Sequence, residues 1–255
     1  MHSEDEILRA SAAWAWFPRG SEQDDAHLQL VRYPERFGGG VRASQVRSSA
    51  DAASVVDHAI ERSREWGATR LTFWTNPSDG PDLEDEFIRR GAVHEDTVTV
   101  FARPIPGDPI DVPADAQTEI VRTLDQVRDV DLVNVPVWEQ HPLDEAGLRE
   151  ELAEVVAALD AGDGGRVLAR LDGRPVSTGG CTVAGGFVRL WGAATLPEYR
   201  GRGAYRAVLA ERLRVGADLG ATTALVKGRV STSAPILARA GFTQYGDERS
   251  YVLAV

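Results

Sequence analysis

The 255-residue sequence has one cysteine, one methionine and few aromatic residues, and these shortages narrow its class. A lone cysteine, Cys181, cannot form a disulfide within the chain, so nothing argues for secretion. No apolar run approaches the ~20 residues that a bilayer-spanning helix needs. The first residues are acidic and polar, unlike a signal or transit peptide. We therefore expect a cytoplasmic protein with no membrane partner.

Positive charge is scarce as well. The chain has 28 basic and 39 acidic side chains, for a net charge of -11. A nucleic-acid partner requires a basic face, so that class is excluded. The five histidines show no metal-binding spacing, so we expect no metal. The excess acid favours cationic or neutral substrates through long-range steering, although solubility alone also explains it.

Prolines gather in one stretch, residues 104–116, which holds Pro104, Pro106, Pro109 and Pro113. Proline removes a backbone donor and fixes an extended path, which is typical of a linker. The sequence thus predicts a first module at 1–103, a linker at 104–116 and a second module at 117–255.

Both modules alternate strand and helix signals, which predicts an α/β fold. In the first module the patterns predict strands at 28–33, 41–48, 69–75 and 97–102, and helices at 51–66 and 82–90. Residues 10–17 are apolar and fit either a helix or a strand. In the second module they predict strands at 118–124, 166–171, 176–183, 187–193, 222–226 and 249–254, and helices at 125–134, 144–161, 204–219 and 234–240.

The most informative stretch is residues 194–206, between a predicted strand and a predicted helix. Its turn holds Gly201 and Gly203 between arginines. Such a turn directs successive backbone N–H groups into one concavity, and the helix adds its unpaired N–H groups and positive dipole end. The stretch therefore predicts an anion site that suits a pyrophosphate.

The same stretch resembles the coenzyme A loop of the GNAT family of N-acetyltransferases. That pattern is Arg or Gln, two residues, Gly, one residue, then Gly or Ala; Arg200 and Gly203 fit, and Tyr205 departs from it. Residues 233–235 and 239–242 resemble the family's late helix and its Gly-Phe terminator. The resemblance implies a GNAT fold for 117–255, with a central mixed, mostly antiparallel sheet flanked by helices (α/β, or α+β).

The resemblance also implies which residues hold the co-substrate, acetyl-coenzyme A. The end of the fourth strand of the domain would pair with pantetheine and stabilise the charged carbonyl oxygen. The loop would hold the pyrophosphate. The implied residues are Ala193, Ala194, Thr195, Arg200, Gly201, Arg202, Gly203, Ala204, Tyr205, Arg206 and Ser233.

The acid and base are less clear. Family members often carry a tyrosine where this chain has Leu237, so that thiolate acid is missing. Tyr245 and Tyr251 are alternatives, or ordinary strand residues. Glu139 and His141 lie between the first two helices of the domain, where the family commonly forms its acceptor site, and are candidate bases or plain loop residues. Cys181 is interpreted as a small core residue.

The first module contains a faint echo of the second. Residues 34–40 align without gaps on 197–203, and 67–69 echo 220–222. We therefore expect 1–103 to be a smaller, degenerate GNAT-like module, or the glycine run to be coincidence. A strand follows residue 40 where a phosphate needs a helix, so we expect no cofactor there.

The sequence thus predicts an acyltransferase that acetylates a primary amine of a small molecule. The main alternative is a non-catalytic acyl-coenzyme A-binding sensor, because of Leu237 and Tyr205. A third hypothesis is a protein N-terminal or lysine acetyltransferase, which an open peptide groove would favour. Exposed strands at the module ends would also allow pairing in a homodimer.

Overall fold

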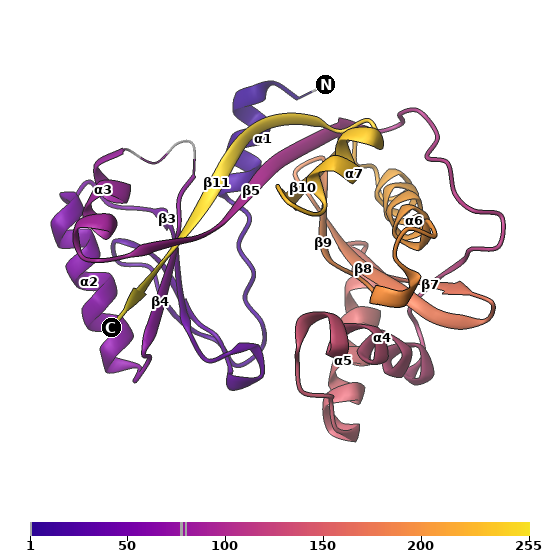
Figure 1. Ribbon diagram of the computed structural model, residues 1–255, viewed down its shortest axis with the longest axis horizontal. Coiled ribbons are helices and arrows are strands. Elements are labelled where there is room, and N and C mark those ends of the chain that lie inside the picture. The colour runs from indigo at the N-terminus through magenta and orange to yellow at the C-terminus, as the bar shows by residue number, and fades with distance from the viewer. Residues whose placement is uncertain (1, 77–78, 80) are drawn as a thin grey trace. The chain divides into compact units, whose positions relative to one another are not determined.

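A computed structural model describes residues 2–76, 79 and 81–255 (Figure 1). Its helices are α1 (Glu4–Ala12), α2 (Ala52–Glu65), α3 (Pro81–Arg89), α4 (Leu124–Trp138), α5 (Glu145–Ala161), α6 (Ala204–Asp218) and α7 (Ala234–Arg239). Its strands are β1 (Glu22–Asp24), β2 (Leu28–Arg32), β3 (Val41–Val46), β4 (Arg70–Trp74), β5 (Val93–Pro104), β6 (Gln117–Ile120), β7 (Gly164–Leu171), β8 (Arg174–Ala184), β9 (Phe187–Thr195), β10 (Thr223–Arg229) and β11 (Thr243–Ala254).

The chain forms two compact units, each described by itself below. The N-terminal unit comprises Ser3–Phe101, Gly228–Leu237 and Gln244–Val255. The central unit comprises Ala102–Lys227 and Ala238–Thr243, together with His2. The predicted modules, 1–103 and 117–255, are continuous stretches of sequence, whereas each compact unit combines separate stretches. The module boundaries stay a prediction.

The N-terminal unit is a mixed sheet with helices on one face. Its strand order is β1-β2-β3-β4-β11-β5, with β3 and β4 parallel and the other register-defined pairs antiparallel. Alternate strand residues pack with α2 and α3 into one core, and these helices lie on the same side of β3 and β4 in Figure 1. That core includes Leu30, Ala43, Phe73, Val56 and Phe87.

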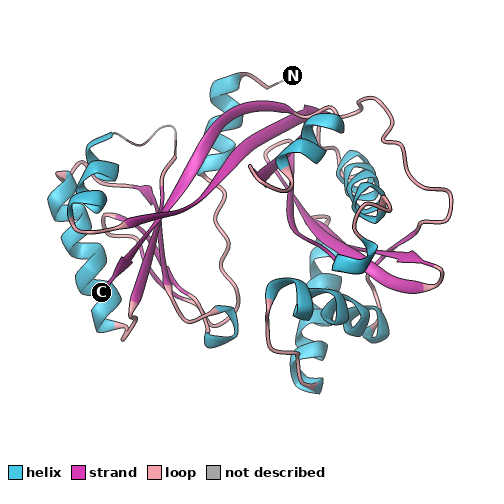
Figure 2. Ribbon diagram, in the orientation of Figure 1, coloured by secondary structure: helices cyan, strands magenta, loops and turns pink. Residues whose placement is uncertain are grey.

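The central unit has helices on both faces of its sheet (Figure 2). Its strand order is β10-β9-β8-β7-β6, with β9 and β10 parallel and the rest antiparallel. Leu168 of β7 joins the core under α4 and α5, whereas its neighbours Val167 and Ala169 pack with Val208 of α6. Successive strand residues point to opposite faces, so α6 covers one face and the α4–α5 pair the other.

Side-chain caps fix where most of these helices begin. Asp51 and Asp144, the first residues of two predicted helices, accept bonds from the third residue of α2 and α5. Thr123 and Gln126 form a capping box at α4. The predicted order of elements after the linker is confirmed. Of residues 10–17, the first three end α1 and the rest have irregular backbone, so the stretch forms neither a separate helix nor a strand.

None of the helices in the described part of the chain has the length and apolar character that a bilayer crossing requires.

Candidate functional site

Strand β9 carries a bulge four residues before it ends. Trp191 pairs with Gly180 and Ala194 with Thr178, so two residues of β9, Gly192 and Ala193, stand opposite one residue of β8. Gly192 has φ +57°, a left-handed backbone that glycine adopts without steric cost. The bulge bends the strand and changes the direction in which its last residues present their backbone groups.

Beyond the bulge, one edge of β9 is open. β10 pairs with β9 from Phe187 to Leu190, and in the described residues no other strand takes that edge further on. The N–H of Leu196 donates to Val176 of β8 at 3.0 Å. Because backbone groups alternate along a strand, the N–H and C=O groups of Ala193 and Thr195 point away from β8, toward the open edge.

The open edge runs directly into a glycine turn. A 3-10 turn at Pro197–Tyr199 leads to Gly201 at φ +78° and Gly203 at φ +84°. Gly203 is the N-cap of α6 and no side chain caps that helix. The first N–H groups of α6 are therefore left for an outside acceptor, at the positive end of the helix dipole. This geometry suits a bound anion.

The arginines of the turn already have partners. Nε of Arg200 donates to the carbonyl oxygen of Thr195 at 3.4 Å. Arg202 pairs with Asp172 at 3.3 Å and lies 3.8 Å from Asp115, and its guanidinium lies over the ring of Tyr199. These side chains are on the surface, so a ligand can reach them by replacing one weak partner.

The proline-containing segment that follows β5 lies against the same turn. Arg206 of α6 pairs with Asp111 at 2.9 Å. A Cβ at Gly203 would lie 2.4 Å from Cγ of Pro113. The segment therefore touches the turn through a proline and brings the carboxylates of Asp111 and Asp115 to two of its arginines.

Tyr205, the departure from the expected pattern, has a defined place. Its ring lies 5.9 Å from the guanidinium carbon of Arg212, two turns further along α6. Arg212 is 1% exposed and donates to the carbonyl oxygens of Gly180 and Trp191. The ring therefore extends along the helix, toward the sheet under the bulge.

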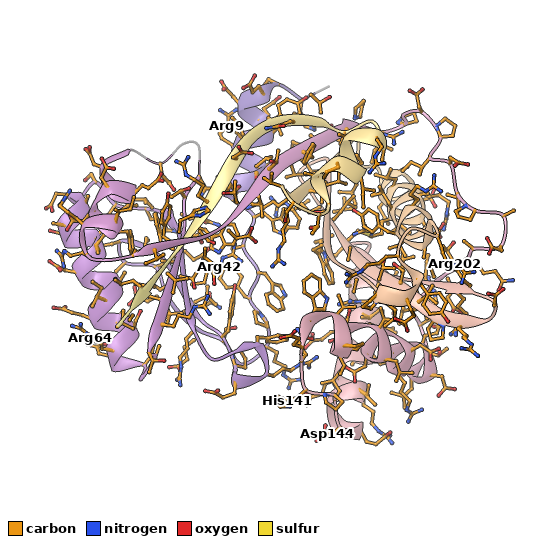
Figure 3. The ribbon with its side chains drawn as sticks, viewed as in Figure 1. Arg9, Arg42, Arg64, His141, Asp144 and Arg202 are labelled. Atoms are coloured by element: carbon orange, nitrogen blue, oxygen red, sulfur yellow. The ribbon has the colours of Figure 1, made fainter. Side chains whose placement is uncertain are left out.

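The two candidate bases lie on the surface of the central unit. Glu139 ends α4 in the left-handed conformation, and His141 lies in the connection to α5, near Asp144 (Figure 3). Both side chains are exposed. Asp131 anchors this connection by accepting the N–H of Leu143 at 3.0 Å. Both residues are therefore held on a defined loop and are open to solvent.

Four other residues considered for the site, Ser233, Leu237, Tyr245 and Tyr251, belong to the N-terminal unit. Ser233 precedes α7 and its carbonyl oxygen accepts the N–H groups of Ile236 and Leu237. Tyr245 lies half-buried on β11. Leu237 is fully buried against Gly228. Tyr251 is a core residue whose hydroxyl donates to Glu84, and burial, followed by Glu84, raises its pKa.

Cys181 is a core residue of β8, as predicted. It is 1% exposed, and burial raises the pKa of its thiol. A buried thiol with a raised pKa is not a nucleophile at neutral pH.

Neither the bulge in β9 nor the contact between residues 104–116 and the glycine turn was predicted from the sequence. Gly192, inside an otherwise regular strand pattern, was a usable signal for the bulge, because an isolated glycine in a strand often marks one. The contacts of Asp111 and Asp115 join residues about 90 positions apart and leave no trace in local sequence.

Comparison with known proteins identifies this arrangement. Residues 125–242 match the model of the acetyltransferase (GNAT) family. The chain carries a GNAT acetyltransferase domain. That match contains the bulged strand, the glycine turn and α6. A domain that matches this family indicates a transferase. Among curated proteins, no sequence matches the chain.

Several solved structures share the fold over nearly the whole chain. A GCN5-related N-acetyltransferase from Kribbella flavida is 21% identical, with a TM-score of 0.66, and the match covers 96% of this chain and 94% of that one. Another from Sphaerobacter thermophilus is 16% identical, with a TM-score of 0.65, over 99% and 85%. A tandem GNAT protein from the clavulanic acid biosynthesis pathway is 15% identical, with a TM-score of 0.62, over 97% and 87%.

These likenesses extend beyond the GNAT domain to the first hundred residues. The aligned turns of the internal echo are both 3-10 turns followed by left-handed glycines. After the first turn comes β3, and α2 begins only at Ala52, so no helix N-terminus lies there. The existence of tandem GNAT proteins with this fold agrees with the hypothesis of a degenerate first module.

Proposed function

We propose that the protein transfers an acetyl group from acetyl-coenzyme A to the primary amine of a small molecule. One observation carries the proposal: the open edge of β9 continues without interruption into a glycine turn at the uncapped N-terminus of α6. Acetyl-coenzyme A joins an extended pantetheine chain to a pyrophosphate. It therefore needs two neighbouring sites, one for each part.

The hydrogen-bonding groups and charges of these residues suit acetyl-coenzyme A. Backbone N–H groups from Gly201 to Arg206 would hold the pyrophosphate, because they face outward at a positive helix end. The edge-facing N–H and C=O groups of Ala193 and Thr195 would pair with the amides of pantetheine, as an added strand does, once the Thr195 carbonyl oxygen has released Arg200. Side chains of Arg202 and Arg206 would add charge after leaving their present partners. Acetyl-coenzyme A supplies an activated thioester.

This chain would contribute chiefly by holding and polarising the reactants. An N–H of Ala193 or Thr195 would donate to the carbonyl oxygen as that oxygen gains charge. Fixing the amine next to the carbonyl removes most of the entropic barrier, so a weak base is sufficient. Glu139 and His141 stay the proposed bases and Tyr245 the proposed acid.

The second candidate is a non-catalytic protein that binds acyl-coenzyme A. The observation that favours it is the burial of Leu237, which places a core side chain where family members often carry the tyrosine that protonates the thiolate. The glycine turn would then bind acyl-coenzyme A without any acyl transfer following.

Release of free coenzyme A tests the two candidates. The assay follows new thiol from acetyl-coenzyme A in the presence of single primary amines, among them polyamines, amino sugars and aminoglycosides. Cys181 is 1% exposed and contributes little background. Amine-dependent release that saturates with one acceptor supports acyl transfer. Tight binding with no release above hydrolysis for every acceptor supports the binding protein instead.

A further inference from the structure

Arg212, in the middle of α6, carries a positive charge in the interior of the central unit. The residue is 1% exposed. Nε donates to the carbonyl oxygen of Val208 at 3.4 Å, and Nη1 donates to those of Gly180 at 3.3 Å and Trp191 at 3.4 Å. Among the described residues no carboxylate pairs with this guanidinium, and its Nη2 has no hydrogen-bond partner. Because a guanidinium stays protonated at neutral pH, a full charge is buried without a counter-charge.

Stability alone does not explain this charge. A buried ion costs folding free energy, and a well-packed apolar side chain of similar size is often at least as stable. The acceptors are backbone groups of regular structure, since Val208 lies within α6 and Trp191 pairs with Gly180 across β9 and β8. The sheet nevertheless leaves space for the guanidinium, because a Cβ at Gly179 would lie 3.0 Å from both Cζ and Nη1 of Arg212. This fit indicates a role for the charge besides stability.

The guanidinium contacts the peptide unit at which the bulge of β9 begins. Its Nη1 bonds the carbonyl oxygen of Trp191, and Gly192 supplies the N–H of the same peptide unit. That peptide bond is trans, so the N–H points in the direction opposite to the carbonyl oxygen. The carbonyl oxygen lies on the side of β8, because the same Nη1 also bonds Gly180. The N–H of Gly192 therefore points toward the edge that β10 leaves open after Leu190.

A cation bonded to a carbonyl oxygen strengthens the N–H of the same peptide as a donor. The cation draws electron density toward the oxygen and away from the nitrogen. Hydrogen bonds linked in this way polarise one another, and the low dielectric of a protein interior enlarges the effect. A charged donor also binds a carbonyl oxygen more strongly than a neutral one does. Arg212 thus makes the N–H of Gly192 a better donor, in a direction that the bulge fixes.

Tyr205 covers this charge on the side of the glycine turn. Its ring is half-buried and lies 5.9 Å from the guanidinium carbon of Arg212, at the outer limit of a cation–π contact. A charge acts more strongly on its surroundings where water is excluded. The glycine or alanine of the family pattern would leave this side of Arg212 less covered. The departure at Tyr205 thus has a physical reason in the buried arginine.

We infer that Arg212 is a positioning residue for acyl transfer: through the Trp191 carbonyl oxygen it directs and polarises the N–H of Gly192, which donates to the thioester carbonyl oxygen. The inference rests on the proposed function and adds Gly192 to the donors named there. As the amine nitrogen bonds to the carbonyl carbon, the oxygen gains the electron pair of the C=O bond, and a stronger donor favours that state. When the C–S bond breaks, its electron pair leaves with sulfur, and the proton lost by the amine completes the thiol.

The first test is Arg212→Met in the full chain, which removes the charge at similar side-chain size. It should keep or raise the melting temperature, bind acetyl-coenzyme A within about threefold of wild type, and release coenzyme A with a kcat at least about tenfold lower. Arg214→Met is the control, because it removes the same charge from an exposed position on α6 and should leave kcat and affinity unchanged. Unchanged kcat in Arg212→Met would overturn the inference. Loss of folding, or an equal loss of affinity and kcat, would show a structural role and overturn it too.

Infrared spectra of bound acetyl-coenzyme A, labelled with ¹³C at the carbonyl carbon, test the polarisation without an acceptor amine. A stronger donor weakens the C=O bond, so the thioester stretch should lie at lower wavenumber in the wild-type complex than in solution. Arg212→Met should lose about half of that shift or more, and an equal shift in both proteins would overturn the inference. If wild type binds but releases no coenzyme A, acyl transfer alone is contradicted, and the infrared shift still decides the role of Arg212. No binding by wild type would contradict both proposals.

Discussion

At the scale of single residues, the bulge in β9 depends on a glycine of the neighbouring strand. A Cβ at Gly180 would lie 2.4 Å from the ring of Trp191, the residue just before the bulge. The indole N–H of Trp191 donates to Thr182 at 2.9 Å, and the guanidinium of Arg166 lies over its ring. The ring is thus fixed from several sides and cannot move away from an added methyl group.

Gly180→Ala should therefore destabilise the protein by about 1–3 kcal/mol, through overpacking. The measurement is the melting temperature. Gly40→Ala is the control, because a Cβ there would meet its nearest atom at an ordinary 3.7 Å. An equal effect of the two substitutions would contradict the packing described for Trp191.

A second residue-scale feature is the ion pair network beneath α4. Arg170 of β7 bonds Glu119 of β6 at 2.6 Å and also pairs with Asp129 of α4. Burial raises the pKa of Glu119, but bonds from Gln126 and Arg170 more than offset it, so the pKa is below the ordinary 4.5. The network joins the sheet to the helix that leads to Glu139.

Because the folded-state pKa of Glu119 is lowered, its contribution to stability is complete above about pH 4.5 and is lost as the pH falls through the folded-state pKa. Glu119→Gln should lower stability at pH 7 by about 0.5–1.5 kcal/mol and reduce the loss on acidification. Melting temperatures at pH 3–7 check this. Exposed Glu154→Gln is the control. Parallel curves for wild type and Glu119→Gln would count against the network.

At the scale of elements, the segment between β5 and β6 lies on the glycine turn. It contributes Asp111 to Arg206 and Asp115 to Arg202. A phosphate that bound these arginines would compete with both carboxylates. Exposed pairs of this kind contribute about 0.2–1 kcal/mol each.

The double variant Asp111→Asn, Asp115→Asn should bind acetyl-coenzyme A about two- to fivefold more tightly than wild type. Its affinity should also fall more steeply with salt, because more of the free guanidinium charge acts on the phosphates. Asp108→Asn serves as the control in the same segment, since Asp108 pairs with neither arginine. Weaker binding by the double variant would show that the carboxylates support the turn instead.

Elements with strong local signals were predictable from the sequence. Asp51 and Asp144 begin α2 and α5 as caps, and Asp172 and Gly173 form the turn between the two predicted strands at 166–171 and 176–183. The start of α1 was also readable, since Ser3 and Glu6 form a capping box, but the sequence analysis missed it. β5 and β11 are longer than predicted, because their polar stretches become strands by pairing with distant partners.

At the scale of the whole molecule, the last strand completes a core built mostly from the first hundred residues. β11 pairs with β4, and Tyr251 and Leu253 are buried beside Phe73 and Leu71. Local patterns predict each of these strands, but not that residues about 180 positions apart are hydrogen-bonded. The turn at 200–206 was predictable because all its parts are contiguous, whereas the open edge beside it depends on where β10 leaves β9.

A fragment of residues 1–103 should therefore not fold cooperatively, since it lacks β11. Joining residues 243–255 to it through a flexible linker should restore a thermal transition, seen by far-ultraviolet circular dichroism. A linked segment with Tyr251 and Leu253 replaced by Ser is the control. Cooperative unfolding of 1–103 alone would contradict the role given to β11.

The most direct test of the central claim is calorimetric titration of acetyl-coenzyme A into wild type, Gly203→Ala and Gly220→Ala. Both glycines flank α6 with φ near +80°, so both variants bear a similar backbone cost. Only the Cβ at Gly203 would meet Pro113 at the turn; none of the described atoms lies within 4 Å of one at Gly220. We predict micromolar or tighter binding by wild type and Gly220→Ala, and at least tenfold weaker binding by Gly203→Ala. Equal affinities in the two variants, or no binding by wild type, would contradict the assignment of residues 200–206 as the coenzyme A site.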